Sequence, residues 1–487
     1  MAHLAIDIGA SGGRAHYGAV EDGRLRVREV HRFANARLDL PGGLFWNAPG
    51  LFQEVKRSLA AAVATGERVE TVGIDTWAVD YAFLGRSGEI LGLPRHYRDP
   101  RTRGLAREVG ERIGRQLLYH RTGVQFQDFN TLCQLIADGR TDRRRLETAE
   151  RFLFMPDLLH YWLTGDAATE ATNAGTSQFF DPRRGVWDRE VLESFEIPSH
   201  FLPEVRRPGS SCGPLRAAVA AETGAKGTRV VRPATHDTAS AVIAVPASGD
   251  AWAYISCGTW SLVGVELSEP NTSSAALAAN FSNEVGWGGT IRFLKNVPGL
   301  WLIQECLAAW SKAGRTIAPE DLDDAAAKSR NDASLIDPDD PLLLGFGPMP
   351  EKIRRAAKRF GVAPESDADI IACIYRSLAL KHRLVLDELR EVTGKRIDTI
   401  HLVGGGSQSE RLCRWTADAA ARPVVAGPLD ATATGNLLAQ SYGDDTLESL
   451  GEIRRVTAAS TELRVYEPES SERWNEAAAK MRRGGAV

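Results

Sequence analysis

Residues 4–14 read LAIDIGASGGR, and this stretch decides the first part of the fold. The apolar run at 4–8 predicts a short buried strand that ends at a glycine. Residues 14–20 predict a second strand rather than a helix, because Gly18 interrupts them. A third strand is expected at 25–33. The chain therefore begins with an antiparallel meander whose first turn is rich in glycine and serine.

The same pattern returns near the middle of the chain. Residues 251–256 and 260–265 predict two strands, joined by the small-residue turn Cys257-Gly258-Thr259. A repeated strand, small turn and strand predicts two related lobes. We place the N-terminal lobe at residues 1–245 and the C-terminal lobe at residues 246–487.

Other segments alternate between strand and helix. Residues 71–75 and 397–403 are expected to form buried strands. Residues 367–392 predict the clearest helix, with one apolar stripe and Gly394 where a C-cap belongs. Residues 245–250 contain proline, serine and glycine and form a suitable link between lobes. Parallel strands with crossover helices, combined with meanders, predict mixed-sheet α/β lobes.

Composition limits the classes of function. The chain has 487 residues, of which 25% are charged and 43% hydrophobic, and its net charge is −4. Without a basic arm or an acidic tail, a nucleic acid is not the expected partner. The start lacks the pattern of a signal peptide, and no run reaches the ~18 apolar residues of a membrane helix. Six widely spaced cysteines are expected to be reduced, buried thiols, which favours a cytoplasmic location.

Three glycine-rich turns follow apolar strands, at residues 9–13, 258–259 and 404–406. Such turns bring backbone N–H groups close to phosphate oxygens, although tight hairpins use glycine as well. The sequence GxxxxGK[ST] is absent, so this is not a P-loop protein. The turn at 9–13 leads into a strand, which argues against a dinucleotide site and a nicotinamide dehydrogenase.

Several carboxylates stand at the ends of predicted elements. Asp7 ends the first strand, where it can form a turn or bind Mg²⁺ through water. Asp237 stands near the N-terminus of a helix expected at 238–245. It can cap that helix, or it can accept a proton as a base that the positive helix end keeps ionised. Arg14 suits either a surface strand or a phosphate contact.

Carboxylates and an indole lie close together in the segment that follows the strand at 71–75. Asp75 and Asp80 flank Trp77, which suits a sugar site because carboxylates bind hydroxyls and an indole covers a ring face. An ordinary core tryptophan explains this segment equally well. The amides of Asn296 and Gln304 are equally ambiguous.

Taken in order, these motifs resemble the FGGY carbohydrate kinases of the actin/hexokinase superfamily over nearly the whole chain. Four motifs carry the resemblance. The first phosphate motif is Ile6-Asp7-Ile8-Gly9 with Ser11, and the second is Gly258-Thr259-Trp260-Ser261. The adenosine motif is Gly404-Gly405-Gly406, and the second interdomain connector is Ala433-Thr434-Gly435-Asn436. Within the family the chain is most similar to the rhamnulokinase group, through stretches that include Ile74-Asp75-Thr76-Trp77, Tyr97-Arg98-Asp99, His236-Asp237-Thr238 and Leu294-Lys295-Asn296.

The resemblance implies two actin-like (ribonuclease H-like) lobes with an interdomain cleft, and transfer of the γ-phosphate of ATP to L-rhamnulose with Mg²⁺. By this resemblance, Asp237 matches the proton acceptor. The positions that match sugar contacts are Ala78, His236, Asp237, Thr238 and Asn296. Those that match ATP contacts are Ala10, Ser11, Gly12, Gly13, Arg14, Thr259, Gln304 and Gly405. The partners expected are a small sugar and ATP, with no nucleic acid and no membrane.

Two positions depart from the family pattern. Ala78 stands where we expect glycine, and its methyl group is expected to tighten the sugar pocket. The first turn reads Ser-Gly-Gly where we expect Ser-Ser-Gly, which removes one hydroxyl donor. The alternatives that remain open are a kinase for L-fuculose or xylulose and a sugar sensor of the same fold without catalysis. An intact Asp7 and Asp237 pair favours an enzyme. The oligomeric state, monomer or dimer, stays open.

Overall fold

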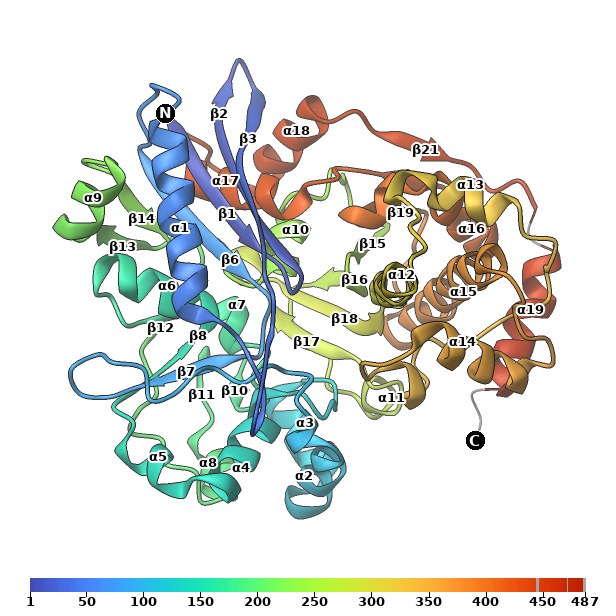
Figure 1. The fold of residues 1–487 in the computed structure, drawn as a ribbon, viewed down its shortest axis with the longest axis horizontal. Helices are drawn as coiled ribbons and strands as arrows, with labels where there is room; N and C mark the ends of the chain where they lie inside the picture. The colour runs from blue at the N-terminus through green and yellow to red at the C-terminus, as the bar shows by residue number, and fades with distance from the viewer. Residues whose placement is uncertain (444–445, 471, 485–487) are drawn as a thin grey trace. The chain divides into compact units, whose positions relative to one another are not determined.

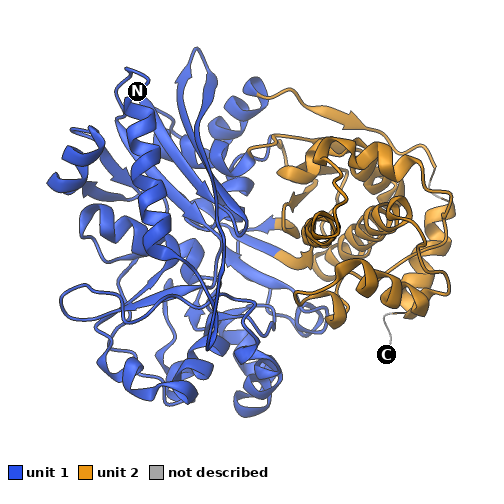
Figure 2. Ribbon diagram, in the orientation of Figure 1, with its two compact units in different colours: residues 1–246, 266–293, 431–460 blue, residues 247–265, 294–430, 461–487 orange. Residues whose placement is uncertain are grey.

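The computed structural model describes residues 1–443, 446–470 and 472–484. The chain divides into two compact units (Figure 2). Unit 1 contains residues 1–246, 266–293 and 431–460, and unit 2 contains residues 247–265, 294–430 and 461–487. The first change of unit lies beside the predicted link. Two later segments, 266–293 and 431–460, return to unit 1, so the units are not continuous in sequence.

Unit 1 is built on a six-stranded sheet with the order β13-β14-β6-β1-β2-β3. Its strands are β1 (Ala2–Ile8), β2 (Gly12–Glu21), β3 (Arg24–Ala34), β6 (Thr71–Thr76), β13 (Ser211–Pro214) and β14 (Arg229–Val231). Strand β1 pairs antiparallel with β2 and parallel with β6, and β2 pairs antiparallel with β3. The predicted opening meander is therefore confirmed.

Helices cover both faces of this sheet. Helix α1 (Ala48–Val63) contacts β1 and β3, and α17 (Ala431–Gly443) contacts β1, β2 and β6 (Figure 1). Helix α17 also packs on α10 (Asp237–Ile243). A buried apolar cluster unites Ala5 of β1 with Ile243 and Leu437. Because side chains alternate along a strand, Asp7 lies on the same face as Ala5, toward α10 and α17.

The remaining elements of unit 1 extend this core. The further helices are α2 (Leu105–Ile113), α3 (Arg115–Thr122), α4 (Thr131–Thr141), α5 (Arg143–Thr148), α6 (Met155–Thr164), α7 (Ala171–Ala174), α8 (Arg189–Glu193), α9 (Ala217–Thr223), α11 (Ser274–Ala278) and α18 (Leu450–Ser460). The further strands are β4 (Leu38–Leu40), β5 (Gly43–Phe45), β7 (Tyr81–Leu84), β8 (Arg151–Phe154), β9 (Thr169–Glu170), β10 (Phe180–Asp181), β11 (Val186–Trp187), β12 (Val205–Arg206) and β17 (Ser282–Val285).

Unit 2 repeats the same plan. Its strands belong to a seven-stranded sheet of the order β17-β18-β16-β15-β19-β20-β21, with β15 antiparallel to β16 and parallel to β19. The strands are β15 (Trp252–Cys257), β16 (Trp260–Leu267), β18 (Ile291–Pro298), β19 (Thr399–Val403), β20 (Val424–Ala426) and β21 (Arg464–Tyr466). The hairpin of β15 and β16 corresponds to that of β1 and β2. The prediction of two related mixed-sheet lobes is therefore confirmed.

The helices of unit 2 are α12 (Trp301–Lys312), α13 (Leu322–Ala327), α14 (Met349–Ala357), α15 (Asp367–Thr393), α16 (Glu410–Ala420) and α19 (Glu472–Gly484). Helix α15 matches the predicted one. It starts with a reciprocal cap between Ser366 and Asp369 and ends at Gly394, which has φ 68°. Each of the six cysteines is a buried free thiol. Within the described part of the chain, no helix combines the length and apolarity needed to cross a membrane.

Candidate active site

Two acidic side chains stand on neighbouring strands of unit 1. The parallel register of β1 and β6 pairs Asp7 with Asp75, so the two side chains lie on the same face of the sheet. Asp75 is completely buried, and its Oδ2 accepts a hydrogen bond of 2.5 Å from the side-chain amide of Asn436 on α17. Burial, followed by the negative charge of Asp7, holds the pKa of Asp75 well above its usual range.

The position of Asn436 is fixed by close packing of α17 on this sheet. A Cβ atom at Gly73 would lie 2.7 Å from the Oδ1 atom of Asn436. Glycine at position 73 therefore lets the helix approach β6 closely enough for Asn436 to reach Asp75. Gln440, one turn later, donates 3.0 Å to the carbonyl of Leu4 and 2.7 Å to Asn436. The carboxylate of Asp75 is thus an internal anchor and not a free sugar ligand.

A tightly bonded turn leads into α10. Thr235 makes most of these bonds: its N–H and hydroxyl each donate 2.9 Å to Oε2 of the buried Glu170, and its carbonyl accepts 2.9 Å from the N–H of Thr76. The N–H of His236 donates 3.2 Å to the hydroxyl of Thr172. These bonds hold the turn between β6 and α7, so the next residue, Asp237, has a defined place.

Asp237 is the first residue of α10, and His236 is the N-cap residue. The prediction that Asp237 stands near a helix N-terminus is confirmed. Its Oδ1 accepts 2.5 Å from the N–H and 3.2 Å from the hydroxyl of Thr238, and it lies 3.4 Å from Nε2 of His236. Burial raises the pKa of Asp237, whereas His236 and Thr238 lower it. The side chain is 29% exposed, so a small molecule can reach it.

Behind His236 lies a buried ion pair. Arg292, which is completely buried, lies 3.1 Å from Oε2 of Glu284 through Nη1. Its Nη2 lies 3.1 Å from Nδ1 of His236, and its Nε donates 3.1 Å to the carbonyl of Val285. The guanidinium therefore contacts both Glu284 and the imidazole ring, and Oε2 of Glu284 itself lies 3.4 Å from Nδ1. Sequence reasoning missed both charged residues, because nothing local connects them with His236.

Ala78 lies on a strained loop after β6. The next residue, Val79, has φ 67°, which costs a β-branched residue roughly 1–3 kcal/mol. The loop is stabilised by Asp80, whose Oδ2 accepts 2.5 Å from the indole of Trp46, 3.0 Å from that of Trp77 and 3.1 Å from a backbone N–H. Burial raises the pKa of Asp80 to about 6. Asp80 therefore organises two indoles, and it is not free to bind sugar.

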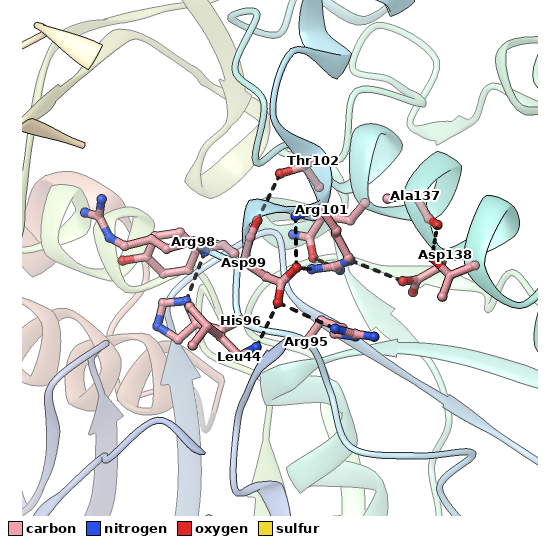
Figure 3. Close-up of polar contacts among 12 residues, drawn as sticks. Leu44, Arg95, His96, Arg98, Asp99, Arg101, Thr102, Ala137 and Asp138 are labelled. Carbon is pink, nitrogen blue, oxygen red and sulfur yellow. Dashed lines mark hydrogen bonds and ion pairs between the residues drawn. The ribbon is translucent and has the colours of Figure 1, made fainter. Parts of the chain in front are cut away.

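A charged network continues outward from Asp80. Oδ1 of Asp80 accepts 2.8 Å from Gln134, whose Oε1 accepts 2.8 Å from Arg101. Figure 3 shows Arg101 reaching toward Asp138, and Asp99 between Arg95 and Arg101. The network fixes the segment after Pro94 against helix α4, and with it the backbone N–H that binds Asp80.

The first glycine-rich turn of unit 1 joins β1 to β2. The N–H of Gly9 donates 2.9 Å to the carbonyl of Gly12, and the turn leaves Ser11 exposed. A Cβ atom at Gly13 would lie 2.2 Å from the ring of Phe33 on β3. A side chain at this position would displace the Phe33 ring, so glycine lets that ring pack against β2, independently of any phosphate. Ala10 and Ser11 lie in the turn, and Gly12, Gly13 and Arg14 follow in β2.

In unit 2 two glycine-rich turns meet the start of α12. The N–H of Leu300 donates 2.8 Å to the carbonyl of Gly258, and the hydroxyl of Thr259 donates 3.4 Å to Oε1 of Gln304. A Cβ atom at Gly405 would have Leu300 and the carbonyl of Cys257 as its nearest neighbours, at 3.8 and 3.9 Å. Thus Thr259, Gln304 and Gly405, which lie far apart in sequence, belong to one region.

Comparison with known proteins identifies this combination of elements. The N-terminal domain of the FGGY family of carbohydrate kinases matches residues 2–244, and the C-terminal domain of that family matches residues 253–443. The chain belongs to the FGGY family of carbohydrate kinases. It has the actin-like fold of that family, with two mixed α/β domains.

Full-length relatives of this FGGY kinase include two rhamnulokinases. The one from Bacteroides thetaiotaomicron is 38% identical over 475 residues, covering 97% of each chain. The one from Bacillus subtilis is 36% identical and covers 97% of this chain and 96% of its own. Among solved structures, glycerol kinase from Plasmodium falciparum with ADP has a TM-score of 0.80 at 14% identity, covering 99% of this chain and 97% of its own. That likeness shows the fold alone.

The predicted site residues of this FGGY kinase fall into two groups. Unit 1 holds Ala78, His236 to Thr238 and the turn from Ala10 to Arg14, and unit 2 holds Thr259, Gln304 and Gly405. Asn296 lies on the part of β18 that belongs to unit 2. Their roles in binding and catalysis stay predictions. Within the described ranges, no three His, Cys, Asp or Glu side chains are grouped so as to hold a metal ion.

Proposed function

We propose that this FGGY kinase is an ATP-dependent rhamnulokinase, which transfers the γ-phosphate of ATP to the O1 hydroxyl of L-rhamnulose in L-rhamnose catabolism. The full-length similarity to curated rhamnulokinases carries the proposal, since those relatives match 97% of this chain. The residues of unit 1 around Asp237 supply the chemistry that such a transfer needs.

Asp237 is proposed as the general base. The O1–phosphorus bond forms as the bond from the γ-phosphorus to the leaving ADP oxygen breaks, and the proton of O1 moves to the Asp237 carboxylate. The first position of α10 and the bonds from Thr238 favour the ionised carboxylate, while burial raises its pKa toward the operating range of a base. Partial exposure leaves room for the sugar hydroxyl.

Phosphate binding is proposed at the two glycine-rich hairpins. The turn at Ser11 in unit 1 and the turn at Thr259 in unit 2 would supply backbone donors, since the N–H of Gly258 already donates to the carbonyl of Trp260. Gln304 and Gly405 would contact ATP beside Thr259. Because phosphoryl transfer depends mostly on positioning and on stabilising charge, these donors contribute directly to the rate.

Mg²⁺ is proposed to bind to phosphate oxygens and, through water, to Asp7. The fit is electrostatic, because the charges of Asp7 and Asp237 both act on Asp75 and raise its pKa, so this corner of unit 1 favours a cation. When bound, the ion would neutralise phosphate charge. An enzyme that uses ATP and keeps six buried thiols free is proposed to work in the cytoplasm.

The sugar is proposed to lie in unit 1, against the loop of Trp77 and Ala78 and beside His236 and Thr238, and Asn296 of unit 2 is proposed as a further sugar contact. Trp77, which is 6% exposed, packs on the completely buried Trp46 with ring centroids 4.0 Å apart, so a small apolar surface backs the loop. Such a surface suits the C6 methyl group of a 6-deoxy sugar, worth ~1–3 kcal/mol. The configuration of the hydroxyl groups should discriminate between sugars more strongly than the methyl group does, because a mismatched sugar leaves buried polar groups unpaired.

The test is the specificity constant kcat/KM for L-rhamnulose, L-fuculose, xylulose and glycerol, measured by coupled ADP release. L-Rhamnulose should give the highest value and glycerol the lowest, with the product phosphate on O1 by NMR. A higher value for L-fuculose or xylulose would leave the kinase class intact and overturn the substrate. The Ala78→Gly variant should broaden acceptance, because it removes the methyl group that narrows the pocket.

A further inference from the structure

The imidazole of His236 is held between two charged groups and the proposed base. Nδ1 lies 3.1 Å from Nη2 of Arg292, and Nε2 lies 3.4 Å from Oδ1 of Asp237. His236 is 6% exposed and Arg292 is completely buried, so water does not screen these interactions strongly. The two ring nitrogens therefore face different partners.

Arginine determines which ring nitrogen carries the proton. A guanidinium has N–H donors and no acceptor, so the 3.1 Å contact with Arg292 is a hydrogen bond only when Nδ1 offers its lone pair. A neutral imidazole with a lone pair on Nδ1 carries its proton on Nε2. The protonated nitrogen is then the one that lies 3.4 Å from Oδ1 of Asp237, the carboxylate that takes the sugar proton.

Glu284 favours the opposite tautomer of His236, with the proton on Nδ1. Its Oε2 lies 3.4 Å from Nδ1 of His236 and 3.1 Å from Nη1 of Arg292. Without Arg292, this buried carboxylate would favour a proton on Nδ1. With Arg292 present, the guanidinium neutralises Glu284 and faces the ring itself, and its orientation is fixed by the bond to the carbonyl of Val285.

We propose that Arg292 is a positioning residue for phosphoryl transfer, which holds His236 in the Nε2–H tautomer and so keeps the protonated ring nitrogen beside Asp237, while Glu284 neutralises the buried guanidinium. The inference rests on the proposed role of Asp237. It separates the two charged residues by function: Arg292 sets the tautomer, and Glu284 supports Arg292.

The experiment reads the tautomer by ¹⁵N NMR of the full-length protein labelled at histidine, with His236→Gln to assign the signal. In the wild type, Nδ1 should give the signal of a ring nitrogen without a proton, and Nε2 that of a protonated one. Arg292→Met should move the proton to Nδ1 or protonate both nitrogens. Glu284→Gln should lower the melting temperature but keep the wild-type tautomer, because Arg292 remains.

Activity supplies a second measurement. Arg292→Met should lower kcat for sugar phosphorylation by about 10²-fold, the loss expected from misplacing a catalytic group by about 1 Å, with the KM for ATP unchanged. The matched control is the double variant Arg454→Met/Glu266→Met. It removes a mostly buried ion pair of the same unit, whose side chains are 13% and 14% exposed. That variant should keep the wild-type His236 signal.

Three results would overturn the inference: a wild-type His236 protonated on Nδ1, an Arg292→Met protein with the wild-type tautomer, or a Glu284→Gln protein that loses it. The wild-type spectrum shows which nitrogen of His236 is protonated, and it tests the inference even if Arg292→Met does not fold. Because the tautomer is read without substrate, a wild-type protein that is inactive toward L-rhamnulose would refute the proposed substrate and leave the tautomer assignment standing.

Discussion

Substitution of Gly435 by alanine tests how accurately the structure places the proposed base. A Cβ atom at Gly435 on α17 would lie 1.8 Å from the backbone oxygen of Ser240 on α10, whereas ordinary contact begins at 3.4 Å. The two helices must therefore separate by about 1.6 Å at this point. Helix α10 starts with Asp237, so the base moves with the helix. Overpacking of this kind costs ~1–3 kcal/mol, and a displacement of ~1 Å can cost ~10² in rate.

The assay combines thermal unfolding with sugar-dependent ADP release for Gly435→Ala. We expect a lower melting temperature and a kcat reduced about 100-fold. Gly443→Ala is the matched control on the same helix: its Cβ would lie 3.2 Å from the carbonyl oxygen of Gly209, so an adjustment of only about 0.2 Å is needed, and kcat should stay near the wild-type value. A Gly435→Ala enzyme with wild-type kcat would refute the coupling between helix packing and the base, even if its stability falls.

Three further outcomes are expected. Because burial raises the pKa of Asp80 to about 6, lowering the pH through 6 should protonate it, loosen Trp46 and Trp77, and raise the KM for the sugar; a KM that stays flat down to pH 5 would contradict this role. Since the folded-state pKa is above the unfolded one, the same protonation favours the folded state. Gln304→Ala should raise the KM for ATP by ~2- to 10-fold, as expected for one neutral hydrogen bond, without changing the melting temperature; an unchanged KM would show that Gln304 does not contact ATP. Asp7→Ala should raise the Mg²⁺ concentration for half-maximal rate by about tenfold, and full activity of the wild type in excess EDTA would overturn the metal's role.

Local signals in the sequence predicted much of the fold. The meander of β1 to β3 follows from alternating apolar residues and glycine turns, and α15 ends at Gly394 as its C-cap pattern indicates. Asp237 was expected near a helix start and stands there. In detail the N-cap is His236, because the side chain of Asp237 binds its neighbour Thr238 instead of a residue further along the helix.

Contacts between distant segments could not be predicted in this way. Asn436 binds Asp75 across 361 positions, and Arg292 binds His236 across 56. Such pairs depend on how sheets and helices pack, which the periodicity of one segment does not contain. The same limit explains Asp75 and Asp80, which suited a sugar site by residue type but are buried and bonded inside unit 1.

The central claim is that Asp237 accepts the proton of the sugar hydroxyl during phosphoryl transfer. The most direct measurement is kcat of Asp237→Asn for L-rhamnulose phosphorylation, together with sugar binding by calorimetry. A general base contributes ~10²–10⁴-fold, so we predict a fall in kcat of that size while the sugar still binds and the melting temperature stays near the wild-type value. An Asp237→Asn enzyme that folds, binds L-rhamnulose and phosphorylates it at the wild-type rate would contradict the account.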